Sequence, residues 1–175
     1  MLDRIPKAML ALSPLSPEAR DVCARLLGAA GVPLQRVLLL PQGRNDAEGQ
    51  ARFNVIDFAV DPLPYGGVNS TLEALDMGVP VVTLRGRKHG ERTSYSILAN
   101  LGVTQTIAES GSEYIDIAVR LATDPAFMAG VRAAIAAGIE RSPLTDMPAH
   151  TRALEDAYVA ALAQTHPEVV GAAAL

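Results

Sequence analysis

The sequence is poor in cysteine and in aromatic residues. Its 175 residues include one cysteine, Cys23, and no tryptophan, and only 4% of them are aromatic. A single cysteine excludes an internal disulfide and any metal site built from several thiolates. The scarcity of aromatic rings disfavours the stacking platforms that bind single-stranded nucleic acid. The core must therefore be mainly aliphatic, and the cysteine usage predicts a reducing, cytoplasmic location.

Long apolar runs and an excess of positive charge are also missing. No segment approaches the ~20 apolar residues of a membrane-spanning helix, and residues 1–7 carry charges and a proline where a signal peptide needs an apolar run. The net charge of -4 disfavours a broad contact with nucleic-acid phosphates. We therefore expect no membrane and no nucleic-acid partner. A chain that is 49% hydrophobic fits one globular domain over residues 1–175.

The common fingerprints of nucleotide and catalytic sites are absent as well. No third glycine follows Gly66 and Gly67 at the spacing of a dinucleotide-binding turn, and no Gly-Lys-Ser/Thr sequence ends a P-loop. The Gly-x-Ser-x-Gly and His-Glu-x-x-His patterns do not occur either. These absences disfavour NAD and ATP as ligands, and they predict neither a serine nucleophile nor a bound metal.

Short apolar runs alternate with helical patterns, which is typical of a parallel sheet covered by helices. The aliphatic segments with the length of buried strands are 8–12, 37–40, 58–60, 79–84 and 105–107. Helices are expected from Ser16, over 46–55, 70–77 and 91–101, from a capping box at Ser110 and Glu113, from Asp124, and over 148–163. The sequence thus predicts an α/β fold, a Rossmann-like parallel sheet with helices on both faces, with a helical C-terminal end that frays at 171–175.

The most informative segment is the turn at 61–73, where an apolar strand runs into two glycines and then a helix. Gly66 and Gly67 allow a sharp turn and a close approach to a ligand, and the first N–H groups of the helix attract an anion. A diphosphate fits there, with Glu73 one turn inside the helix to accept hydrogen bonds from ribose hydroxyls. The same residues also suit ordinary turn chemistry, with Ser70 as N-cap and Glu73 completing a capping box. The residues themselves leave both interpretations open.

A basic loop at 85–92 follows the strand at 79–84. Its basic members are four permanent cations and a histidine: Arg85, Arg87, Lys88, Arg92 and His89. Ligands of open α/β sheets bind at the carboxyl ends of the strands, where this loop and the glycine turn both lie. We therefore expect the cations to neutralise a diphosphate through charge-assisted hydrogen bonds. The alternative is a solvated surface loop.

Several longer segments together carry a family resemblance. They lie at 40–44 (Leu-Pro-Gln-Gly-Arg), 61–67 (Asp-Pro-Leu-Pro-Tyr-Gly-Gly), 73–84, 92 with 96–98, 113–118 and 142–144. In this order, from about residue 8 to the last helix, the chain resembles the C-terminal lobe of the O-GlcNAc transferase family, especially its SPINDLY-like bacterial members. The matches cover most of the chain.

The resemblance implies a two-lobed, GT-B-type glycosyltransferase that binds UDP-GlcNAc through this lobe. Such an enzyme transfers the sugar to Ser or Thr hydroxyls of an acceptor protein, with UDP-GlcNAc or another UDP-sugar as donor and without a metal or cofactor. The residues that the resemblance assigns to the nucleotide sugar are Gln42 and Arg44 near the uracil, Gly66, Gly67, Asn69 and Ser70 at the diphosphate, Glu73 at the ribose, and Arg92. No residue is assigned as catalytic.

The chain also departs from the family. In animal members of the family a histidine precedes the two residues that match Asn69 and Ser70, and Val68 stands at that position here. A second histidine of those members falls near Gly49. The chain begins at what resembles the second strand of the lobe, so the first strand, its diphosphate-binding lysine and the N-terminal lobe have no match. We therefore expect an incomplete transferase that does not transfer sugar alone. A missing strand would expose a sheet edge, and dimerisation through that edge is a hypothesis.

Two other functions stay open from the sequence. One is a sugar-nucleotide epimerase or another Rossmann-like enzyme, which a glycine-rich dinucleotide turn would signal. The other is a non-catalytic module that serves assembly. Tyr114, Tyr158, Met77 and Met128 each fit the apolar spacing of their helices and are predicted to pack in the core.

Overall fold

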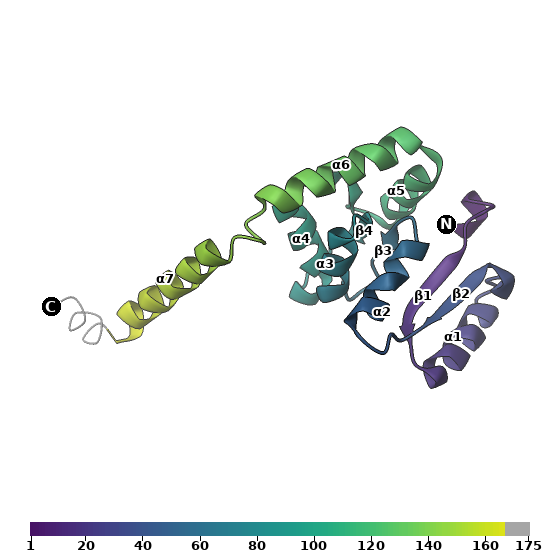
Figure 1. Ribbon diagram of the computed structural model, residues 1–175, viewed down its shortest axis with the longest axis horizontal. Coiled ribbons are helices and arrows are strands. Elements are labelled where there is room, and N and C mark those ends of the chain that lie inside the picture. Colours follow the sequence, from purple (N-terminus) through teal and green to yellow (C-terminus); the bar gives the residue numbers. More distant parts are fainter. Residues whose placement is uncertain (167–175) are drawn as a thin grey trace.

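The computed structural model describes residues 1–166, and it confirms the predicted alternation of strands and helices (Figure 1). The elements are β1 (Leu10–Leu15), α1 (Pro17–Ala29), β2 (Val37–Pro41), α2 (Asp46–Ala51), β3 (Ala59–Val60), α3 (Asn69–Asp76), β4 (Val81–Leu84), α4 (Thr93–Leu101), β5 (Ile107–Ala108), α5 (Gly111–Thr123), α6 (Pro125–Arg141) and α7 (Met147–Thr165). Short 3-10 turns lie between some of them. The frayed end predicted at 171–175 lies outside the described residues.

The strands form two parallel sheets, whereas the sequence predicted one. β1 pairs with β2, with Leu10 opposite Val37. β4 lies between β3 and β5, with Ala59 opposite Val81 and Thr83 opposite Ile107. Within residues 1–166 no strand pairing joins these two sheets. In the view of Figure 1, β1 lies between β2 and β3, so the break falls between β1 and β3. An aliphatic run predicts that a strand forms, but not which strand it pairs with.

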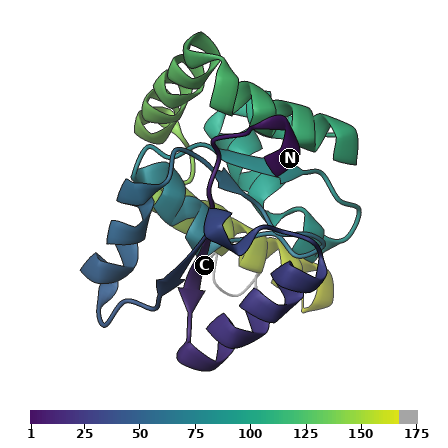
Figure 2. The same ribbon diagram turned by 90° about the vertical axis from the view of Figure 1, so that its right-hand side faces the viewer.

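The apolar core surrounds the three-stranded sheet. Val81, Val82 and Thr83 of β4 are buried, as expected for a strand covered on both faces. The buried side chains packed around them from α3 to α6 include Leu75, Leu98, Ala118, Leu121, Val131 and Ile135. No residue of α1 or β2 is buried. Figure 2 shows α6, in green, and α1, in dark purple, on opposite sides of the molecule. The turn between β3 and α3 is thus anchored on the well-packed half of the chain.

Several helix starts agree with the sequence. Ser16 accepts a hydrogen bond from the backbone N–H of Ala19 at 3.2 Å, and Asp124 accepts one from Phe127 at 3.0 Å. Ser110 caps α5 in the same way, but Glu113 accepts from the N–H of the residue before Ser110, so this capping box closes one residue early.

The capping box predicted at Ser70 and Glu73 is wrong. α3 begins at Asn69 with Val68 at the N-cap position, and no side chain caps it. Ser70 is therefore inside the first helical turn, whereas an N-cap residue has extended backbone and points its oxygen back at the free N–H groups. The Glu73 carboxylate pairs with Arg52 instead. In the described residues the first turn of α3 thus has no side-chain cap at its N-cap position.

The last described helix, α7, extends away from the body of the molecule (Figure 1). Its side chains are exposed except for half-buried Ala149. The packing predicted for Tyr158 is therefore wrong, because that residue is 62% exposed. The same prediction is wrong for Met77, which is 38% exposed, whereas Met128 packs against the core. None of the helices in residues 1–166 has the length and apolar character needed to cross a membrane.

Candidate functional site

A buried carboxylate at the end of β3 fixes the glycine turn. Asp61 is only 5% exposed. Its Oδ1 accepts the backbone N–H of Gly67 at 2.7 Å, and its Oδ2 accepts the hydroxyl of Thr83 at 2.8 Å. The hydroxyl of Tyr114 donates to the backbone carbonyl of Asp61 at 2.7 Å. Asp61 is therefore held by β4 and α5, and it holds the turn in a defined position over the core.

Tyr114 packs against the core as predicted, but its hydroxyl has a further role. Burial, and then the negative charge of Asp61, raises the pKa of Tyr114 well above its usual range. The protonated hydroxyl donates to the backbone carbonyl of Asp61. Apolar spacing in the sequence predicts the buried ring, but it carries no signal for this hydrogen bond across 53 residues.

The opposite side of the turn is held by α4 and by the basic loop. The hydroxyl of Ser94 donates to the carbonyl of Gly67 at 3.0 Å, and it shares a hydrogen bond with the hydroxyl of Thr71 at 2.8 Å. The N–H of Gly66 donates to the carbonyl of Gly90 at 3.0 Å. The glycine turn and the basic loop, which the sequence placed at the same sheet edge, are thus joined directly.

Both glycines of the turn are required by close contacts. A Cβ at Gly66 would lie 2.8 Å from Asp61 Oδ2, and one at Gly67 would lie 2.6 Å from the hydroxyl of Ser70. Real Cβ atoms do not approach oxygen so closely, so a side chain at either position would force the turn or these neighbouring side chains to move. The absence of a side chain brings the backbone close to whatever binds there.

Two helices without side-chain caps begin beside this turn. α3 starts at Asn69 directly after it, and both Asn69 and Ser70 are exposed. α4 starts at Thr93, next to Ser94, and also has no side-chain cap. The Thr93 Oγ1 is buried without a hydrogen-bond partner in the described part of the chain. Uncapped N–H groups and the positive ends of two helix dipoles favour an anion at this place.

Glu73 lies one turn inside α3 and forms an ion pair. Its Oε2 is 2.5 Å from Nη2 of Arg52, whose side chain is 17% exposed. Arg52 also donates to the carbonyl of Gly49 at 2.7 Å, and its guanidinium lies 4.5 Å from the centroid of the Phe53 ring. A carboxylate accepts several hydrogen bonds, so the pair leaves capacity for ribose hydroxyls. Sequence reasoning missed Arg52, because no local spacing links it to a partner 21 residues away.

Glu91 organises the basic loop from within. Its Oε2 accepts the backbone N–H groups of Arg87 at 3.0 Å and Lys88 at 3.2 Å. These hydrogen bonds, the one from Arg87 first, lower the pKa of Glu91. Arg87, Lys88 and the neighbouring His89 are exposed, which leaves their side chains accessible to a ligand.

The other two cations of the loop make contacts within the protein. Arg85 pairs with Glu109 at 2.6 Å. Arg92 lies over the ring of Tyr95, 4.7 Å from its centroid, and donates to the carbonyl of Gly86 at 3.3 Å. Arg92, a predicted site residue, therefore holds the loop, and no hydrogen bond joins it to the glycine turn within residues 1–166.

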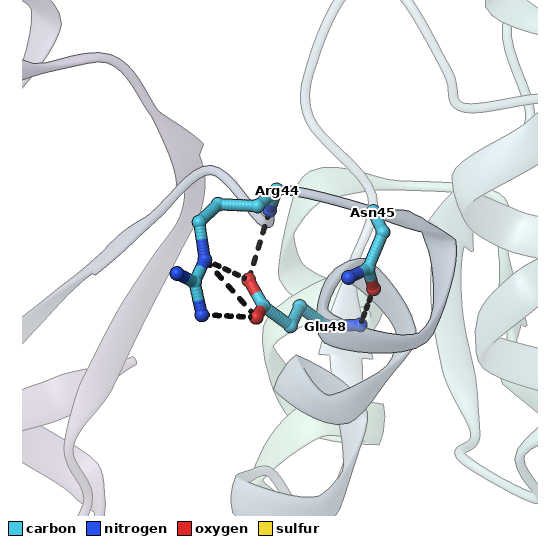
Figure 3. A network of polar contacts seen from close by, with 3 residues as sticks. All are labelled: Arg44, Asn45 and Glu48. Carbon is cyan, nitrogen blue, oxygen red and sulfur yellow. Dashed lines mark hydrogen bonds and ion pairs between the residues drawn. The ribbon is translucent and has the colours of Figure 1, made fainter.

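The predicted uracil loop lies beyond β2 (Figure 3). Arg44 donates from Nη2 to Glu48 at 2.7 Å and from its backbone N–H at 3.0 Å, while Asn45 caps α2 by accepting the N–H of Glu48 at 2.9 Å. The hydrogen bonds from Arg44 lower the pKa of Glu48. Gln42 is exposed just after the strand. In the described chain, neither Gln42 nor Arg44 is hydrogen-bonded to the glycine turn, so their part in a common site stays a prediction.

An apolar cavity of about 310 Å³ lies next to Glu73, lined chiefly by Leu72, Leu75, Ile97, Leu101, Ile139 and Leu144. No residue of the glycine turn lines it, so this cavity is separate from the candidate anion site. Among residues 1–166, no group of three or more histidine, cysteine and acidic side chains is placed to hold a metal ion.

Comparison with known proteins gives a consistent result. The family description "Glycosyl transferase family 41" matches residues 1–154. The chain is 32% identical over 133 residues to a probable UDP-N-acetylglucosamine–peptide N-acetylglucosaminyltransferase SPINDLY of Solanum lycopersicum. The matched region covers 76% of this chain and 14% of that protein. It is 26% identical over 156 residues to the UDP-N-acetylglucosamine–peptide N-acetylglucosaminyltransferase of Caenorhabditis elegans, covering 89% of this chain and 14% of that one.

A solved structure shares the fold. A mutant of the Thermobaculum terrenum O-GlcNAc transferase superposes with a TM-score of 0.80 at 37% sequence identity, over 90% of this chain and 31% of the solved one. The α/β fold is therefore that of a GT-B glycosyltransferase lobe. The chain belongs to glycosyl transferase family 41, as its sequence motifs indicated. It spans about 14% of the length of the curated relatives described above.

Proposed function

We propose that this chain is the donor-binding lobe of a glycosyltransferase that uses UDP-GlcNAc and modifies Ser or Thr hydroxyls of proteins. The observation that carries the proposal is the glycine turn at the start of α3. Hydrogen bonds with Asp61 and Ser94 hold the backbone of this turn on two sides. The helix that follows the turn has no side-chain cap. Two relatives are named as a probable and as a UDP-N-acetylglucosamine–peptide N-acetylglucosaminyltransferase, and these names support the identity of the donor and the acceptor class.

In this proposal the diphosphate lies against the first turn of α3. The N–H groups of Asn69 and Ser70 and their side chains donate to the phosphate oxygens, and the dipole of α3 stabilises their negative charge. The ribose hydroxyls donate to Glu73, whose position Arg52 fixes. Arg87 and Lys88 are exposed on a loop tied to the turn and approach the same charge.

The chemical consequence concerns the leaving group. Transfer of the sugar breaks its bond to the diphosphate, so negative charge develops on UDP as that bond lengthens. Fixed N–H donors and cations stabilise the developing charge without having to reorganise, and such electrostatic stabilisation usually contributes more to catalysis than any other single effect. No residue of this chain is proposed as catalytic base.

We infer that the lobe is incomplete as it stands. In doubly wound sheets of strand order 3-2-1-4-5-6, the first strand lies between the second and the fourth. The break between β1 and β3 supports the view that a central strand is missing between them. An acceptor site and the second lobe would also have to come from outside these residues.

The proposal is tested by thermal unfolding with UDP, UDP-GlcNAc, ADP and NAD. A ligand at ~100 times its dissociation constant stabilises the protein by ~2.7 kcal/mol, which gives a clear shift. We expect a shift with the two uridine nucleotides and none with NAD. Equal shifts with ADP and UDP would contradict uridine selectivity, and no shift with any nucleotide would contradict a preformed donor site.

A second candidate, a non-catalytic assembly module, is favoured by one observation. The break between the two sheets leaves strand edges that pair with nothing in the described chain. Such edges add strands from other chains. Light scattering at high concentration distinguishes the candidates, because the assembly module forms a stable dimer through this edge even without nucleotide, and a strictly monomeric chain contradicts it.

A further inference from the structure

Asp61 is a buried carboxylate to which the resemblance assigns no role. It is 5% exposed, and its hydrogen bonds come from neutral donors only: a backbone N–H, and the hydroxyl of Thr83. Burying a charged carboxylate is costly unless hydrogen bonds compensate for the lost water. Both carboxylate oxygens of Asp61 are used by these hydrogen bonds, one to the turn and one to β4, so its role lies in what the hydrogen bonds position.

The geometry points to Asp61 as a positioning residue that sets the glycine turn for the diphosphate. Its Oδ1 accepts the N–H of Gly67 at 2.7 Å, and its Oδ2 lies 2.8 Å from where a Cβ of Gly66 would be. The same carboxylate thus orients one peptide of the turn and excludes a side chain from the preceding residue. This inference rests on the proposed function, because it explains how the anion site at α3 is shaped.

Both peptide groups that flank the Cα of Gly67 are held. Asp61 accepts the N–H of Gly67, and Ser94, which is 1% exposed, donates to the carbonyl of Gly67 at 3.0 Å. α3 begins two residues later without a side-chain cap, so the direction of its first N–H groups follows from the orientation of these two peptide groups. The N–H of Gly67 is also occupied by Asp61, which leaves the diphosphate to the N–H groups of Asn69 and Ser70.

Asp61 is itself fixed by two other elements. The hydroxyl of Thr83 in β4 donates to Oδ2, and the hydroxyl of Tyr114 in α5 donates to the backbone carbonyl. Asp61 thus links the glycine turn to β4 and α5 through hydrogen bonds, and without these hydrogen bonds the turn would be free to reorient. Asp61 does not contact the proposed ligand, so it affects ligand affinity only by positioning the turn.

The test compares Asp61→Ala with Asp61→Asn and measures UDP affinity by calorimetry and Gly67 amide exchange by NMR. The amide oxygen of asparagine can accept the Gly67 N–H, and its NH₂ can donate to Thr83. We expect Asp61→Ala to weaken UDP binding by about ten- to a hundredfold, as for a lost hydrogen bond to a charged group. We expect Asp61→Asn to restore most of the affinity and to keep the Gly67 amide protected.

Two further variants keep the result interpretable. Val131→Ala truncates a buried residue of α6 away from the turn, and it should lower stability while leaving UDP affinity unchanged. If Asp61→Ala does not fold, the double variant Asp61→Ala with Thr83→Val replaces it, because it leaves no buried hydroxyl without an acceptor.

The outcomes separate this inference from the proposed function. Unchanged Gly67 exchange in Asp61→Ala overturns the positioning role, and so does an equal loss of UDP affinity in Val131→Ala. If the parent chain does not bind UDP, the proposed function fails, and the Gly67 exchange in the alanine and asparagine variants still decides whether Asp61 holds the turn.

Discussion

Glu73 is the residue at which a structural and a functional role can be separated most cleanly. The sequence offered a capping box, which the structure excludes because α3 starts before Ser70. The ion pair with Arg52 gives the carboxylate a fixed position without using all its acceptor capacity. The ribose role stays a prediction that one substitution can test.

The change Glu73→Gln should weaken UDP binding by about 1–3 kcal/mol, because ribose hydroxyls lose a charged acceptor. The affinity for inorganic pyrophosphate, which has no ribose, should not fall. Calorimetry with both ligands measures the difference. Asp76→Asn is the matched control, since it removes the same charge from an exposed position of α3 and should leave both affinities unchanged. An unchanged UDP affinity in Glu73→Gln rules out the ribose role.

The second prediction for a single residue concerns acid. The folded-state pKa of Glu91 is lowered by the N–H groups of Arg87 and Lys88. A carboxyl whose pKa is depressed by folding adds stability above its unfolded pKa and loses it as the pH falls through the folded value. The basic loop should therefore loosen only as the pH falls below the ordinary carboxyl pKa of 4.5.

This loosening is visible as faster amide exchange, or as shifted NMR signals, at Arg87 and Lys88. In Glu91→Gln the same signals should show no such acid transition. A transition of the same size in that variant would show that another group controls the loop.

Side-chain roles of this kind were only partly predictable. Gly66, Gly67 and the acidic residue that follows them form a local pattern, so the sequence indicated a turn with a close backbone approach. Asp61, Ser94 and Arg52 act through partners far away in the chain, and no spacing in one sequence links them. Long-range hydrogen bonds become visible only when the elements are in place.

Among the helices, starts with a Ser or Asp cap and Pro at the first position were predicted correctly, because that chemistry is local. The start of α3 was not, since its backbone is set by Asp61 and Ser94 rather than by a cap. Strand existence was likewise predictable from aliphatic runs, whereas strand pairing depends on contacts between distant segments.

α6 offers a paired test of packing at two glycines. A Cβ at Gly130 would meet open space, so Gly130→Ala should raise the free energy of unfolding by about 0.5–1 kcal/mol through better helix propensity. A Cβ at Gly138 would collide with the backbone carbonyl of Leu101 in α4, so Gly138→Ala should lower it by about 1–3 kcal/mol. Urea denaturation measures both changes. Stabilisation by Gly138→Ala would show that α4 and α6 do not pack as described.

For the whole molecule, the proposed function makes this chain one lobe of a larger catalytic unit. The fold matches 31% of a solved O-GlcNAc transferase chain, and the described residues hold a candidate donor site without a candidate base. The sequence predicted the fold class and the family, because both rest on many matching segments. It could not show that the five described strands divide into two sheets, since that depends on the missing pairing between β1 and β3.

The purified chain should therefore transfer no sugar from UDP-GlcNAc to peptide, although it binds the nucleotide. Incubation with radiolabelled donor and a Ser-rich peptide measures this, with an active family member as positive control. Turnover that follows the protein through purification would contradict an incomplete enzyme.

The diphosphate site at the glycine turn is tested most sharply by an NMR titration of this chain with UDP, and with uridine as the matched ligand that lacks the diphosphate. We expect the amide signals of Asn69 and Ser70 to shift strongly with UDP and weakly with uridine, while that of Gly130 stays in place. Binding of UDP that leaves the amides at the start of α3 unmoved would contradict a diphosphate site at the glycine turn.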